Sequence, residues 1–162
     1  MDLKGLFRRF TGSDGGGILS FSMAIDLGTA NTLVYVANRG IVLEEPSVIA
    51  LENDGGAVAA VGGDAKVMLG RTNRNLTVIR PLKDGVITNA TATLAMLKEF
   101  FARSQTRRFS MRPRVLVCVP SGITEVEKTA VRDSLERAGA REVLMVSEPL
   151  ASALGVGLRV EG

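Results

Sequence analysis

The sequence contains no histidine and only one cysteine. Without histidine the chain lacks the commonest general base and metal ligand of proteins, so Ser/His and Cys/His triads and histidine-based zinc sites are excluded. The single cysteine, Cys118, permits no disulfide bond within the chain, which suits a reducing compartment. Because Cys118 lies within the apolar run Val115–Val119, we expect a buried small hydrophobe rather than a nucleophile. Any catalysis must therefore use carboxylates, backbone amides and a bound ion.

Long apolar runs, aromatic residues and a strong excess of one charge are scarce as well. No segment approaches the ~20 apolar residues of a membrane-spanning helix, and none forms the apolar core of a signal peptide. A formal net charge of +3 with 4% aromatic residues does not indicate a nucleic-acid partner. The 162 residues, of which 46% are hydrophobic and 23% charged, are typical of a globular chain with one domain or two small lobes.

The sequence does carry a glycine turn between two apolar strands. Met23 and Ile25 alternate with smaller residues, as in a strand with one buried face, and the β-branched stretch Thr32–Val36 predicts a second strand. The turn between them, Gly28–Asn31, combines a glycine with two polar side chains. Successive amide groups in such a turn form an anion-binding concavity, and Asp26 at the strand end is placed to hold a divalent cation through water. The alternative is a plain β-hairpin with a solvated aspartate.

A second carboxylate follows a strand in the C-terminal part of the sequence. The continuous apolar run Val115–Val119 predicts a strand buried on both faces, and Glu142–Ser147 predicts another. Between them, a helix begins at the capping box Thr124–Glu127 and ends at Gly139. This α/β crossover pattern collects ligands at the carboxyl ends of its strands. Glu148 lies at such an end, and by its spacing it is either a site residue or a carboxylate that caps the next helix.

Several long stretches of the sequence resemble the MreB family of bacterial actin homologues, within the actin and Hsp70 superfamily. They read D-L-G-T-A-N-T-L-V-Y, then G-I-V-L-E-E-P-S-V, G-R-T-N-R-N-L-T-V-I-R-P-L-K-D-G-V-I, V-P-S-G-I-T-E-V-E-K and S-E-P-L-A-S-A-L-G. Together they span nearly everything from Ala24 to Gly157. The resemblance implies an α/β fold: an actin-like (ribonuclease H-like) ATPase lobe with a mixed β-sheet flanked by helices and a small inserted α/β subdomain.

The residue pattern at the start of the chain and the resemblance over the rest together predict a division into parts. We expect an amphipathic membrane-targeting helix over residues 1–10 and a glycine-rich linker over 11–17. Subdomain IA would comprise 18–45 and 86–162, and the small subdomain IB would comprise 46–85. The family continues with a second phosphate hairpin and a second large lobe that bears the adenosine pocket. Because the sequence stops before both, we expect a fragment or a truncated gene that lacks the second half of the fold.

The resemblance also implies ATP and Mg²⁺ as cofactors. The phosphates would lie against the turn residues Gly28, Thr29, Ala30 and Asn31. Asp26 would hold Mg²⁺ through water, and Glu148 takes the position of the family's acidic residue that orients the attacking water.

By resemblance, the function is that of an ATP-binding cytoskeletal protein whose membrane-associated filaments direct cell-wall synthesis and determine rod cell shape. Its expected partners are further copies of itself, the anionic inner-membrane surface and the cell-wall elongation machinery. The expected location is the cytoplasm, at the inner face of the cytoplasmic membrane. The alternatives are an Hsp70-like chaperone or sugar-kinase-type ATPase lobe, and a non-catalytic interaction fragment. A chaperone would need a substrate domain and a kinase a sugar pocket with its own base, and neither is evident in the sequence.

Two stretches indicate how the chain would reach a membrane. At helical spacing, four apolar residues near the start fall on one face: Leu3, Leu6, Phe7 and Phe10. A later stretch, where MreB relatives have a small apolar insertion loop, places arginines around an apolar pair. The arginines are Arg103, Arg107, Arg108, Arg112 and Arg114, and the pair is Phe109 and Met111. The alternatives are a terminus that is frayed or docked on the domain, and a solvated arginine surface with Phe109 packed on the domain.

Overall fold

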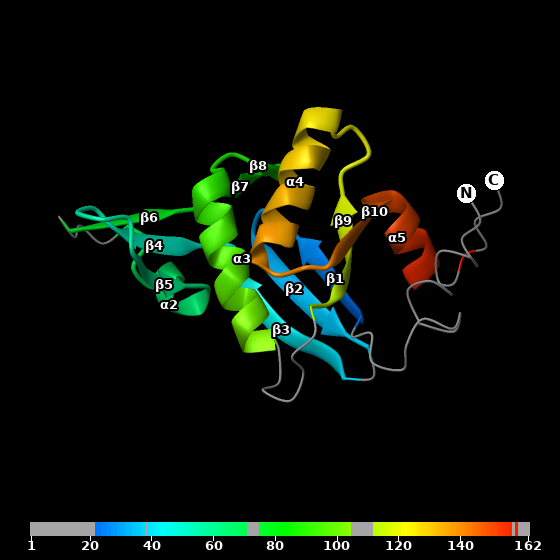
Figure 1. The fold of residues 1–162 in the computed structure, drawn as a ribbon, viewed down its shortest axis with the longest axis horizontal. Coiled ribbons are helices and arrows are strands. Elements are labelled where there is room, and N and C mark those ends of the chain that lie inside the picture. The colour runs from blue at the N-terminus through cyan, green and yellow to red at the C-terminus, as the bar shows by residue number, and fades with distance from the viewer. Residues whose placement is uncertain (1–21, 38, 71–74, 105–111, 157, 159–162) are drawn as a thin grey trace.

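Five strands form a mixed sheet in the larger lobe, in the order β10-β9-β1-β2-β3 (Figure 1). In chain order these strands are β1 (Ser22–Leu27), β2 (Asn31–Val36), β3 (Gly40–Pro46), β9 (Arg114–Val119) and β10 (Glu142–Ser147). The neighbours β1, β9 and β10 run parallel to one another, whereas β2 pairs antiparallel with both β1 and β3. Parallel neighbours require crossover connections, as the strand–helix–strand pattern of the sequence predicted.

The computed structural model describes residues 22–37, 39–70, 75–104, 112–156 and 158. The expected helix over 1–10 and linker over 11–17 lie outside these residues. The expected membrane residues also lie outside them: Leu3, Leu6, Phe7, Phe10, Phe109 and Met111. Within the described ranges, no helix is both long enough and apolar enough to cross a bilayer.

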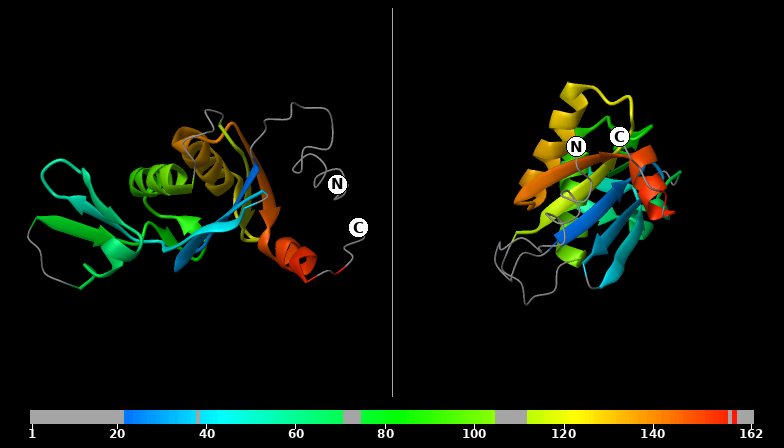
Figure 2. Two further views of the ribbon diagram at one scale, coloured as in Figure 1. Left: turned by 90° about the horizontal axis from the view of Figure 1, so that it is seen from below. Right: turned by 90° about the vertical axis from the view of Figure 1, so that its right-hand side faces the viewer.

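Helices cover the two faces of the sheet unequally. α3 (Ala90–Ser104) and α4 (Glu125–Ala138) lie on one face, and α5 (Glu148–Gly155) lies on the other (Figure 2). The core lies beneath α3 and α4, where the fully buried side chains include Met23, Ile25, Val34, Met96, Leu97, Phe100, Val115 and Val117. Along β9 burial alternates, so the expectation of a strand buried on both faces was wrong. α5 packs against β9 on the second face of the sheet (Figure 2), where Leu116 and Cys118 stay partly exposed.

The sequence signals at the two ends of α4 are confirmed. The Thr124 hydroxyl accepts a hydrogen bond from the Glu127 N–H, and the Glu127 carboxylate accepts one from the Thr124 N–H at 2.8 Å. This reciprocal capping box satisfies two amides that would otherwise lack a partner. At the other end Gly139 has a φ of 134°, a conformation that favours glycine.

A small subdomain follows β3 and has a core of its own. It comprises β4 (Ile49–Glu52), β5 (Val58–Val61), the one-turn helix α2 (Gly63–Lys66) and β6 (Leu76–Ile79). Its strands pair in the order β5-β4-β6, and Val48, Ala50 and Ala65 form its buried cluster. The chain returns to the larger lobe through a short hairpin, β7 (Leu82–Lys83) and β8 (Val86–Ile87).

We predict that Thr124→Ala lowers the free energy of unfolding by about 1 kcal/mol, because the substitution removes the capping hydroxyl of α4. Urea denaturation monitored by circular dichroism measures this change. Thr124→Ser is the matched control, since serine keeps the hydroxyl and should stay within a few tenths of a kcal/mol of the parent. Equal stability losses in the two variants would show that the hydroxyl does not stabilise α4.

Candidate functional site

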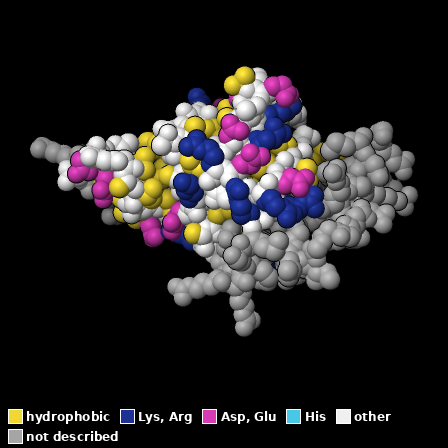
Figure 3. All heavy atoms as spheres, in the orientation of Figure 1, with side chains coloured by type: hydrophobic (Ala, Val, Ile, Leu, Met, Phe, Trp, Pro, Cys, Tyr) yellow, Lys and Arg dark blue, Asp and Glu magenta, His cyan; other side chains and the backbone are white. Residues whose placement is uncertain are grey.

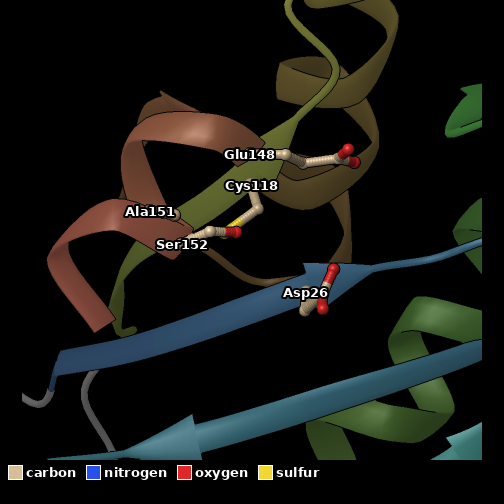
Figure 4. A pocket seen from close by; sticks show the side chains of 5 residues that line it. All are labelled: Asp26, Cys118, Glu148, Ala151 and Ser152. Atoms are coloured by element: carbon tan, nitrogen blue, oxygen red, sulfur yellow. The ribbon is translucent and has the colours of Figure 1, made fainter. Parts of the chain in front are cut away.

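An open pocket of about 500 Å³ lies at the carboxyl ends of the parallel strands. Its lining residues are Asp26, Cys118, Glu148, Ala151 and Ser152, which come from β1, β9 and α5 (Figure 4). The parallel register pairs Asp26 with Cys118, and α5 begins at Glu148 directly after β10. The structure therefore brings together the two carboxylates that the sequence placed in separate stretches, and both are exposed to solvent.

Cys118 lies between the two carboxylates (Figure 4) and is only partly buried, so the expectation of a buried side chain was wrong. Partial burial raises the pKa of the Cys118 thiol, and the negative charges of Asp26 and Glu148 raise it further. A thiol whose pKa is raised stays protonated at neutral pH and is a poor nucleophile. The expectation that Cys118 is not a nucleophile agrees with this environment.

The glycine turn beside Asp26 is tight. β1 ends at Leu27 and β2 begins at Asn31, so Asn31, expected in the turn, belongs to the strand. A Cβ atom added to Gly28 would lie 2.7 Å from the Asn31 carbonyl oxygen, so this position requires glycine. Ala30 and Asn31 are exposed, whereas Gly28 and Thr29 are half-buried. The turn residues are not among those that line the pocket, which they adjoin through Asp26.

Sequence reasoning missed Ser47, which holds the turn from behind. This side chain is fully buried. Its hydroxyl donates a hydrogen bond to the Gly28 carbonyl oxygen at 2.7 Å, and its N–H donates to the Ala30 carbonyl oxygen at 2.9 Å. The available signal was a polar residue directly before the apolar stretch Val48–Ala50.

The turn between β7 and β8 also reaches the site, and sequence reasoning assigned it no part there. Its residues Asp84 and Gly85 have φ angles of 52° and 75°. The Gly85 N–H donates to the Thr29 hydroxyl at 3.0 Å. A Cβ atom on Gly85 would lie 2.5 Å from Pro120 Cγ and 3.7 Å from Glu148 Oε1. This Asp-Gly turn therefore links the glycine turn to the neighbourhood of Glu148, and its dipeptide was a turn signal in the sequence.

The donor set of the pocket suits a hard cation that keeps most of its water. Among the described residues, no group of three or more Cys, Asp or Glu side chains lies close enough to hold a metal ion. The pocket itself offers the carboxylates of Asp26 and Glu148. Mg²⁺ is bound in proteins by one or two carboxylates together with water and substrate phosphates, so the residues present fit this ion. Glu148 is also the first residue of α5, where its charge favours the helix N-terminus.

The described arginines of the expected membrane stretch contact the domain itself. Arg103 pairs with Glu99 at 3.1 Å, and Arg114 pairs with Glu142 at 2.8 Å. Arg112 donates to the last carbonyl groups of α4, at 2.8 Å to Glu136. Figure 3 shows Lys and Arg side chains interspersed with Asp and Glu over α3 and α4. These contacts favour the solvated-surface alternative for these three arginines.

Comparison with known proteins tests the expected fold. A family model described as MreB/Mbl protein matches residues 20–162. The cell shape-determining protein MreB of Escherichia coli (strain K12) is 54% identical over 150 residues, which cover 89% of this chain and 43% of the relative. The crystal structure of MreB5 of Spiroplasma citri bound to AMPPNP matches with a TM-score of 0.79 at 35% identity, over 88% of this chain and 43% of that one.

A more distant solved structure agrees with these. The MamK double helical filament gives a TM-score of 0.71 at 21% identity and covers 85% of this chain and 43% of that one. The expected actin-like fold is thus confirmed. The chain spans about 43% of the length of these relatives.

We predict that Cys118 is alkylated by iodoacetamide more slowly at pH 7 than a free thiol such as glutathione, because its raised pKa keeps it protonated. Asp26→Asn should shift the pH–rate profile towards lower pH, since it removes a negative charge that raises this pKa. Glu52→Gln, an exposed substitution on β4, is the matched control. An unchanged profile for Asp26→Asn would mean that the two side chains do not interact as described.

Proposed function

The chain belongs to the MreB/Mbl family, and from this premise we propose that it forms the first half of the nucleotide site of an actin-like ATPase. The observation that carries the proposal is the convergence of Asp26 and Glu148 in one pocket, beside the glycine turn that begins at Gly28. A polyphosphate with a divalent cation needs anion-binding amides next to a carboxylate. The bound AMPPNP of the Spiroplasma citri relative supports an adenine nucleotide as the ligand.

In this proposal each group of the site has a separate task. The backbone amides of Gly28–Asn31 bind phosphate oxygens, and Asp26 holds Mg²⁺ through water ligands. When bound there, Mg²⁺ would supply neutralisation of the phosphate charge. Glu148 accepts a hydrogen bond from the attacking water and thereby orients it. Cys118 remains a neutral wall of the pocket because its thiol is protonated.

We further propose that the complete protein polymerises into filaments at the cytoplasmic face of the inner membrane and contributes to cell shape through the cell-wall elongation machinery. The name of the Escherichia coli relative, a cell shape-determining protein, supports this proposal. Family membership favours it over the chaperone and sugar-kinase alternatives.

The fold offers a geometric argument for the membrane part of the proposal. β1 and β9 are parallel, and Ser22 pairs with Arg114 at their amino ends. Ser22 and Arg114, which follow the two expected membrane stretches in the sequence, therefore lie at the same edge of the sheet. That edge is opposite the pocket, which lies at the carboxyl ends of the strands. We propose that a membrane binds on the side of this edge, away from the nucleotide.

We predict that the chain binds Mg²⁺–ATP weakly, with a Kd on the order of 1 mM, and binds inorganic triphosphate about as well. The reason is that the proposed contacts are to phosphates and to the ion, whereas the chain spans about 43% of its relatives. Isothermal titration calorimetry measures both affinities. A low-micromolar Kd for Mg²⁺–ATP, with much weaker binding of inorganic triphosphate, would contradict the proposal that the adenosine contacts lie outside this chain.

Substitutions at the two carboxylates separate their tasks. Asp26→Asn should weaken Mg²⁺–triphosphate binding roughly tenfold, about 1.4 kcal/mol, and should remove most of its dependence on Mg²⁺. Glu148→Gln should leave binding within about twofold, since Glu148 is proposed to act on water. Glu44→Gln, at an exposed site on β3, is the control. If Glu148→Gln abolished both binding and folding, the helix-capping interpretation of Glu148 would be preferred.

We predict that the chain co-sediments with anionic liposomes and that salt weakens this binding, because basic side chains near such a surface contribute about 1 kcal/mol each. Leu6→Glu combined with Phe7→Glu should abolish most of the binding by placing charge on the apolar face. Equal binding by parent and double variant would exclude the N-terminal segment as the main anchor. Phe109→Ser with Met111→Ser would then test the second stretch.

A further inference from the structure

One short stretch of backbone joins the glycine turn to the small subdomain. It runs from Glu45 to Val48, at the end of β3 and before β4, and is called here the connector. Its central residue, Ser47, is fully buried and bonds to the carbonyl groups of Gly28 and Ala30. The connector therefore holds the turn at two points from the side of β3.

Ser47 forms a third hydrogen bond, with the hydroxyl of Thr32. The Ser47 and Thr32 hydroxyl oxygens lie 2.9 Å apart, and both side chains are fully buried. A serine hydroxyl has one proton, and that of Ser47 is donated to the Gly28 carbonyl oxygen. Thr32 must therefore donate to Ser47. Removal of the Thr32 hydroxyl would leave the bond between Ser47 and the turn in place.

The bonds from Ser47 also fix which way the amides of the turn point. In a trans peptide the N–H lies opposite the C=O of the same unit. Because the carbonyl groups of Gly28 and Ala30 are directed to Ser47, the N–H groups of Thr29 and Asn31 lie on the other side of the turn. These amides belong to the set proposed to bind phosphate.

The two ends of the connector bind the small subdomain. The Glu45 carboxylate accepts a hydrogen bond from the Gly63 N–H at 2.7 Å, at the start of α2. The Val48 carbonyl oxygen accepts one from the Gly62 N–H at 2.9 Å. Glu45 also pairs with Arg103 of α3 at 3.5 Å. Gly62 has a φ of 67°, a conformation that favours glycine, and a Cβ atom there would also meet the end of the Glu45 side chain.

We propose that Ser47 is a positioning residue for phosphate binding, and that the connector couples the conformation of the glycine turn to the start of α2. The proposal rests on the proposed function, in that it takes Gly28–Asn31 as the phosphate site. If phosphate binding displaces the turn, Ser47 moves with it because the two are hydrogen-bonded. The connector then displaces Gly62 and Gly63, which are hydrogen-bonded to Val48 and Glu45. Conversely, displacement of the small subdomain changes the direction of the turn amides.

The test uses the 162-residue chain and three variants of it. Ser47→Ala removes the bond to Gly28, and Thr32→Val is the matched control that removes a buried hydroxyl but leaves that bond. Ser47→Cys is of similar size and a weaker donor, so it gives an intermediate effect and replaces Ser47→Ala if that variant does not fold. The measurements are backbone ¹H–¹⁵N shifts and a titration with Mg²⁺ and inorganic triphosphate.

We expect Ser47→Ala to shift the amide signals of Thr29 and Asn31 and also those of Gly62 and Gly63, and to weaken triphosphate binding roughly tenfold, which corresponds to about 1.4 kcal/mol. Thr32→Val should keep the Thr29 signal and should bind within about twofold of the parent.

Three results would count against one or other proposal. Signals of Thr29, Asn31, Gly62 and Gly63 in Ser47→Ala that match the parent would overturn the role of Ser47. Equal effects of Ser47→Ala and Thr32→Val would also overturn it, because they would indicate general loss of core stability. If the parent itself bound no triphosphate, the proposed function would fail, and the amide signals would still decide whether Ser47 couples the turn to α2.

Discussion

Parallel pairing between β1 and β9 is the constraint on which the rest of the site depends. Because side chains alternate along a strand, the register that places Met23 and Ile25 against α3 and α4 leaves Asp26 on the opposite face, next to Cys118. A slip of one residue would turn Asp26 into the apolar core, and burying an unpaired carboxylate costs several kcal/mol. The hydrophobic core therefore keeps Asp26 on the opposite face of the sheet, near the carboxyl end of β1.

The negative charge of the pocket determines which ligands it can bind. Its described lining holds two carboxylates, Asp26 and Glu148, and no Lys or Arg side chain. A bare polyphosphate would be repelled by these charges, whereas a divalent cation attracts both the carboxylates and the phosphates. Burial raises the pKa of the Cys118 thiol, and the same negative charges raise it further. On this reasoning, the ion and the phosphates bind as one unit.

The domain separates its proposed tasks in space. The pocket lies at the carboxyl ends of the parallel strands, whereas Ser22 and Arg114, which follow the expected membrane segments in the sequence, pair at the amino ends. The small subdomain lies to one side of the sheet and is tied to it through Glu45 and Ser47 (Figure 1). The hydrogen bonds of this junction are partly shielded from water, so losing a partner would leave a partly desolvated polar group. These bonds are the route by which the proposed coupling links the glycine turn to α2.

Local patterns in the sequence were sufficient for the strand that carries Asp26, for the capping box of α4 and for its end at Gly139, because hydrophobic alternation and capping act between near neighbours. The family resemblance added the role expected of Glu148. Only the tertiary structure decided that Cys118 is partly exposed between two carboxylates, that Ser47 holds the glycine turn, and that Gly85 lies against Thr29 and Pro120. Ser47 and Gly28 are 19 positions apart in the sequence, and Gly85 and Thr29 are 56 positions apart. Strand register and the crossing of the chain between two lobes bring such residues together, and neither leaves a short-range pattern in the sequence.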